Sequence, residues 1–187
     1  MTTGISATAL TSTKLFVTKR YGSKKWDEVL GLMKEATQNQ YKRHLTPKTW
    51  IDYDQVVDML KAMKKTFGDD EPKILIELGK HNSEENLRVT QRIIMKILSV
   101  EWVLKMAARL WKGRVRDGGI LIIQRKGKKH GMGILDKFPD PQPEWLEYLI
   151  GWFTRTIELS GGRNVKVELV KAGSKPFDSS EYELQWS

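Results

Sequence analysis

The sequence predicts an α+β fold in which an N-terminal helical part is followed by a ββαββ unit. Over roughly the first hundred residues, apolar side chains recur at helical spacing between capping and breaker residues. From Gly113 the pattern changes to short β-branched or alternating runs. A single aromatic-rich helix separates two pairs of predicted strands. We therefore expect an antiparallel sheet packed on one long helix.

Residues 1–112 form the predicted helical part. The first helix ends at Gly22, and Ser23 begins the second. The polar stretch 38–49 is predicted to be a loop. Pro72 starts a short helix that stops at Gly79, and Ser83 is expected to cap the next. The apolar stripes are Leu10, Val17 and Tyr21; Trp26, Val29, Leu30 and Met33; Tyr53, Val56, Val57, Leu60, Met63 and Phe67; Leu87, Ile94 and Ile97; and Val100, Val103, Leu104, Ala107 and Trp111.

Residues 113–187 form the predicted β-β-α-β-β part. Residues 119–124 and 131–138 are typical of a hairpin, with Gly127 in a basic turn. After three prolines, a helix carries apolar residues on one face and ends at Gly161 and Gly162. Residues 165–169 and 182–186 alternate between apolar and polar, as half-buried strands do. We expect the two parts to form one domain, 1–187.

The hairpin and the residues leading to it hold most of the net charge. The chain has a net charge of +9, and the segment from Lys112 to His130 contributes +6, from seven basic residues and one acid. Such a cluster is typical of a polyanion site for nucleic acid or an anionic surface. It is equally typical of a solvated hairpin tip that resists edge-to-edge pairing. The candidate anion-binding residues are Arg114, Arg116, Arg125, Lys126, Lys128 and Lys129.

The glycines of this hairpin do not form a nucleotide loop. A dinucleotide-binding loop needs a helix after its glycines, so that the helix N-terminus faces the phosphates. Gly131-Met132-Gly133 runs into a predicted strand instead. The glycines are therefore expected to serve the hairpin itself.

Nothing in the sequence favours catalysis or a metal site. The chain lacks cysteine, and its three histidines, His44, His81 and His130, match no zinc spacing. No serine, histidine and acid follow the order of a hydrolase. No stretch approaches the roughly 18 apolar residues that span a bilayer. We therefore expect a non-enzymatic cytoplasmic protein with no catalytic residue, no metal and no membrane span.

Seven tryptophans are many for a chain of 187 residues. Several lie on apolar faces of the predicted helix and strands, which most often places them in the core. An alternative is an aromatic-lined cavity between helix and sheet for an apolar ligand. If such a pocket exists, its expected lining is Trp145, Leu149, Trp152, Phe153, Ile122, Ile134 and Val167.

Short segments along nearly the whole chain carry a family resemblance. They include LFVTKRYGSKKWDEVL (15–30), ELGKHNSEENL (77–87), LWKGRVRDGG (110–119), FPDPQP before a Gly151-Trp152 helix, and the final YELQW. In these the chain resembles the superfamily of haem nitric-oxide/oxygen binding (H-NOX), 4-vinyl reductase and TRAPP-type domains. It is most similar to bacterial members related to the haem-NO-binding domains. The resemblance implies their fold, an apolar pocket and a habit of pairing with a like domain.

The sequence departs from that superfamily where its members do their chemistry. H-NOX domains ligate haem through a histidine on the helix after the segment that 77–87 resembles, and hold the propionates with Tyr-x-Ser-x-Arg. Residues 87–111 contain no histidine, and that motif does not occur. The cysteines of 4-vinyl reductase and TRAPP domains are also missing. The resemblance thus implies no cofactor.

From the residues and the resemblance together, we predict a sensory or scaffold module that binds a small apolar ligand or a partner protein and forms a homodimer. Polyanion binding through the basic hairpin and a haem-based gas sensor are the alternatives.

Overall fold

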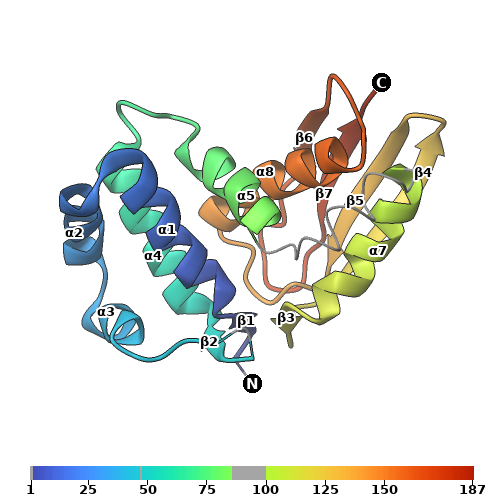
Figure 1. Ribbon diagram of the computed structural model, residues 1–187. Helices are drawn as coiled ribbons and strands as arrows, with labels where there is room; N and C mark the ends of the chain where they lie inside the picture. Colours follow the sequence, from blue (N-terminus) through green and yellow to red (C-terminus); the bar gives the residue numbers. More distant parts are fainter. Residues whose placement is uncertain (1, 47, 86–99) are drawn as a thin grey trace.

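The computed structural model describes residues 2–46, 48–85 and 100–187, and Figure 1 shows their arrangement. Helices α1 to α4 gather on one side of the molecule, α5 and α8 lie in the middle, and α7 lies beside the β4–β5 hairpin (Figure 1). The elements are β1 Gly4–Ser6, α1 Thr8–Tyr21, α2 Ser23–Leu32, α3 Glu35–Tyr41, β2 Trp50–Asp52, α4 Tyr53–Phe67, α5 Ile74–Glu85, α7 Val100–Lys112, β3 Val115–Arg116, β4 Ile120–Gly127, β5 His130–Asp136, α8 Pro143–Leu159, β6 Lys166–Lys171 and β7 Ser180–Gln185.

The predicted α+β architecture is confirmed. Strands β4, β5, β7 and β6 form an antiparallel sheet in that order. The hairpin register pairs Ile122 with Ile134, and β5 pairs with β7 through Gly133 and Tyr182. The long helix α8 packs on this sheet, since a Cβ at Gly133 would lie 3.0 Å from Cζ of Phe153. The hairpin glycine therefore makes room for a core aromatic ring.

A second, smaller sheet joins the two parts of the chain. Strand β1 pairs with β2 on one side and with β3 on the other, in the order β2-β1-β3. Strand β2 belongs to the N-terminal part and β3 lies at the start of the C-terminal part. By pairing with each of them, β1 connects the two parts. These strands are two or three residues long. A segment that short shows no alternation, and the sequence did not predict this sheet.

Two helical predictions were wrong. Residues 35–41, partly assigned to a loop, form α3. The helix expected to stop at Gly79 continues through it to Glu85 as α5, so Ser83 lies inside a helix and caps nothing. The inward positions predicted for Leu87, Ile94 and Ile97 lie outside the described residues. In the part that the structure describes, no helix is long and apolar enough to cross a membrane.

Close packing between α5 and α8 explains why Gly79 does not end its helix. A Cβ at Gly79 would collide with the carbonyl oxygen of Tyr148, and a Cβ at Gly151 would collide with that of Ile76. The two helix backbones therefore touch. Ser83 and Thr156 add a buried hydrogen bond of 3.0 Å between them. Both glycines serve helix contact, which outweighs their low helix propensity.

Candidate functional site

Five aromatic side chains occupy the interior where α4, α7 and α8 meet the segment after β5. We call Tyr53, Trp111, Phe138, Trp145 and Tyr148 the aromatic cluster. All five are buried. Trp145 stacks on Tyr148 with 5.2 Å between ring centroids, and Tyr53 meets Phe138 edge-on at 5.0 Å. Trp111 lies 6.3 Å from both Phe138 and Trp145. The cluster connects the helical part to the β part.

Two polar atoms of the aromatic cluster have no partner among the residues that the structure describes. The indole Nε1 atoms of Trp111 and Trp145 are buried and make no hydrogen bond to that part of the chain. A buried indole N–H usually finds an acceptor, because leaving it bare costs about 1–3 kcal/mol. Their presence in an otherwise apolar interior is typical of a site that offers donors to a ligand.

A group of polar side chains lies beside the aromatic cluster. We call Ser6, Thr8, Asn82, Arg114 and Tyr148 the central polar cluster. Arg114 Nη1 donates to Thr8 Oγ1 at 2.9 Å, and Thr8 Oγ1 lies 3.1 Å from Ser6 Oγ. The amide of Asn82 is fully buried, and neither of its polar atoms makes a well-formed hydrogen bond. Four separate segments thus bring a guanidinium, hydroxyls and an amide together.

Burial sets the electrostatics of this cluster. It raises the pKa of Tyr148 to about 12, although the adjacent Asn82 amide and Arg114 each lower it. Burial also lowers the pKa of Arg114, against the opposing effect of Tyr148. The phenol therefore stays neutral and a cation stays beside it. A partly buried guanidinium of this kind suits a carboxylate ligand.

The three histidines lie in different environments. His44 is exposed in a loop. His130 is on β5, with its Nε2 atom 2.9 Å from Glu183 Oε1. His81 is on α5, where its ring lies 5.3 Å from the ring of Phe16. Its Nε2 atom is buried and has no hydrogen-bond partner within the described ranges. Burial lowers the pKa of His81, so at neutral pH it presents the uncharged imidazole that binds metals.

The predicted pocket residues do not all lie on the same face of the sheet. Trp145, Leu149 and Phe153 are buried core residues, while Trp152 and Val167 are partly buried against that core. Ile122 and Ile134 lie on the opposite face from the core, because their neighbours Leu121 and Leu135 are the buried ones. Ile122 and Ile134 are thus one residue of register away from the strand positions that face the other predicted pocket residues.

The six predicted anion-binding residues also divide. Arg114 belongs to the central polar cluster, and the guanidinium of Arg116 lies 5.2 Å from the ring centroid of Trp50. Arg125, Lys126, Lys128 and Lys129 are exposed at the far end of the hairpin. The length of β4, at about 3.3 Å per residue, separates the two sets by about 20 Å. They therefore do not form one continuous patch.

Among the described residues, no group of three or more histidines, cysteines or carboxylates could hold a metal ion. The sequence reasoning missed the central polar cluster. Its members lie far apart along the chain, so no local motif marks it.

No protein-family model matches the chain, and no curated protein sequence matches it significantly. Solved structures do. A substitution variant of Tt H-NOX has a TM-score of 0.71 and 16% identity, over 98% of this chain and 95% of that one. A structure from a study of heme distortion in the H-NOX family has a TM-score of 0.70 and 17% identity, with the same coverage of both chains. The third is an oxygen-binding H-NOX domain related to soluble guanylate cyclases, solved as its oxygen complex. Its TM-score is 0.69 and its identity 16%, again with the same coverage.

The chain therefore has the H-NOX fold, as its resemblance implied. These comparisons overturn one prediction. The absence of a cofactor was inferred from missing motifs, yet the structures that share the whole fold come from work on heme and include an oxygen complex. The absence of a local motif was too narrow a ground for that inference.

Proposed function

We propose that this chain is a sensory domain that detects a small gas through a bound haem. The observation that carries the proposal is the likeness in fold over 98% of the chain to heme-related and oxygen-binding domains. Haem would supply an iron atom able to bind a diatomic gas. The protein would supply the groups that hold it and the contacts that respond to it.

The described residues include groups of the kind that haem needs. His81 would offer an uncharged imidazole whose Nε2 has no partner among the described residues, and the backbone oxygen of Ser12 accepts a hydrogen bond from the same ring. Such a second hydrogen bond fixes the tautomer of a metal-binding histidine. Arg114 and Tyr148 would offer a cation and a hydroxyl to the haem carboxylates. The central polar cluster thus contains an arginine, a tyrosine and a serine, Ser6, although these do not form the Tyr-x-Ser-x-Arg motif.

Haem reconstitution tests the proposal directly. The purified protein is incubated with haemin, passed through a desalting column, reduced, and exposed to nitric oxide, carbon monoxide or oxygen. We expect one haem per chain, a Soret band that survives desalting, and a shift of that band with at least one gas. Loss of all haem on the column would contradict the proposal.

Two substitutions sharpen this test. His81→Ala should abolish the retained Soret band or change its position, because it removes the proposed iron ligand. His44→Ala is the matched control, since His44 is exposed in a loop and should leave the spectrum unchanged. Equal effects of the two variants would exclude His81 as the ligand. Circular dichroism of each variant checks that the fold is intact.

A second candidate role is association with a like domain. The observation that favours it is the apolar pair Ile122 and Ile134, paired in register on the sheet face that points away from the core. Both side chains are half-buried, and Ile120 on the same face is 43% exposed, so this face offers apolar area of the kind found at interfaces. We propose a homodimer through this face. Light scattering after gel filtration should give twice the chain mass, and Ile122→Lys should give the single mass. A monomeric wild-type protein would contradict it.

A further inference from the structure

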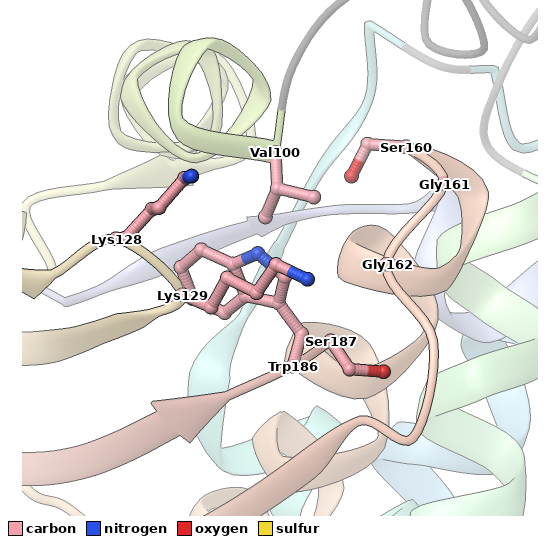
Figure 2. A pocket seen from close by; sticks show the side chains of 8 residues that line it. All are labelled: Val100, Lys128, Lys129, Ser160, Gly161, Gly162, Trp186 and Ser187. Carbon is pink, nitrogen blue, oxygen red and sulfur yellow. The ribbon is translucent and has the colours of Figure 1, made fainter.

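An open surface cavity lies at the tip of the basic hairpin, away from both clusters described above. It has a volume of about 300 Å³. Figure 2 shows Val100, Lys129 and the indole of Trp186 on one side, and the turn from Ser160 to Gly162 on the other. Lys128 extends from the hairpin at its edge (Figure 2). This volume is at the lower end of the range for ligand pockets, so the cavity suits a small molecule.

A backbone hydrogen bond holds the segment that carries Trp186, and two glycines lie next to its side chain. The Trp186 backbone N–H donates to the carbonyl oxygen of Lys129 at 3.2 Å, which fixes the chain beside the hairpin tip. A Cβ at Gly162 would lie 2.6 Å from Ile157 Cγ2 and 3.4 Å from Cβ of Trp186, so this position admits no side chain. A Cβ at Gly131 would be 4.0 Å from the indole ring. Trp186 is therefore fixed beside the hairpin tip through its backbone, and it lines the cavity.

Charge is distributed unevenly around this cavity. Lys128 and Lys129 lie on the hairpin side, and neither makes an ion pair with any residue that the structure describes. The opposite side is the C-terminal end of α8, where the helix dipole is negative. A bare inorganic anion would meet that unfavourable end. A ligand that also has an apolar end can pair its anionic end with the two lysines and pack its apolar end on Trp186 and Val100.

We propose that this cavity binds a small aromatic carboxylate. The carboxylate pairs with the ammonium groups of Lys128 and Lys129, and the ring packs on the indole of Trp186 and on Val100. The inference assigns a role to the lysines that the haem proposal leaves unused, and it does not depend on haem.

Benzoate is the probe. Two-dimensional NMR of the ¹⁵N-labelled full chain resolves tryptophan indole N–H signals, and the signal missing in Trp186→Phe identifies Trp186. We expect benzoate to shift that signal in a saturable way. Lys128→Ala with Lys129→Ala should weaken benzoate binding more than about tenfold, because both charge-assisted contacts are lost. Lys126→Ala is the matched control: it removes a charge from the same hairpin outside the cavity and should change the affinity less than about twofold.

Each contrary result overturns the proposal in its own way. Equal binding of benzyl alcohol would show that the carboxylate is irrelevant. Equal binding of inorganic phosphate would show that the ring is irrelevant. An equal loss of affinity in the Lys126 variant would show a diffuse charge effect, and an unshifted Trp186 signal at saturating benzoate would show that this cavity is not the site. A protein that fails to take up haem would leave all of these outcomes unchanged.

Discussion

Gly151 on α8 lies against the backbone carbonyl of Ile76 on α5, with no space for a side chain between them. This contact sets the distance between two helices that also share the Ser83–Thr156 hydrogen bond and the ion pair of Arg155 with Glu84, 2.8 Å long. Because the clash would be with backbone, neither helix can relieve it by changing a rotamer. The position of α5, and of the His81 and Asn82 side chains on it, depends on this glycine.

The first prediction concerns that contact. Gly151→Ala should lower the free energy of unfolding by about 2–3 kcal/mol, as overpacking of a core typically does. Gly31→Ala is the control, because Gly31 lies near the end of α2 with open space around it. That change should be neutral or raise stability by about 0.5–1 kcal/mol. Urea unfolding followed by circular dichroism measures both. Equal stability of the two variants would show that α5 and α8 can move apart freely.

The sequence predicted more of the fold than of the site. The order of elements from β4 to β7 followed from alternation, glycines and prolines, and it was right. The run Ile120-Leu121-Ile122-Ile123 is apolar at every position, so it could not show which residues face the core. The pairing with β5, where glycines alternate with larger residues, shows which residues of β4 face the core. The central polar cluster is assembled from residues 6, 8, 82, 114 and 148, and its tertiary proximity is invisible in any local pattern.

A second prediction concerns pH and His81. Burial lowers the pKa of this imidazole, while Glu85 and Glu84 raise it and Lys19 lowers it. The unfolded chain therefore binds a proton at a higher pH than the folded one. Its contribution to stability is present above the unfolded pKa, about 6.5, and is lost as pH falls through the lower folded value. The stability difference between wild type and His81→Gln should thus shrink from pH 7.5 to pH 5, measured by urea midpoints. A difference that grows on acidification would contradict the assigned sign.

A third prediction concerns alkaline pH. All five tyrosines, Tyr21, Tyr41, Tyr53, Tyr148 and Tyr182, have raised pKa values, and burial is the largest cause for each. The unfolded phenols lose protons near pH 10 and the folded ones do not. Stability from this source is therefore complete below pH 10 and is lost as pH rises above it. Phenolate absorbance should appear together with loss of helical circular dichroism, in one step. In the protein unfolded by guanidinium, the phenolate absorbance should follow an ordinary tyrosine titration. Phenolate absorbance that rises near pH 10 while the helical signal is still intact would show that a tyrosine ring is exposed in the folded protein.

The last prediction separates stability from function at Asn82. Its fully buried amide makes no well-formed hydrogen bond, and a buried polar group in that state costs about 1–3 kcal/mol. Asn82→Leu with Tyr148→Phe replaces both facing polar groups by apolar ones, so the ligand-free protein should be as stable as wild type or up to about 1 kcal/mol more stable. If these groups contact the haem that we propose, the same variant should retain less of it after desalting. Unchanged stability with reduced haem retention assigns the pair to ligand binding. A loss of more than about 2 kcal/mol would instead show that the amide and the phenol hold the empty fold together.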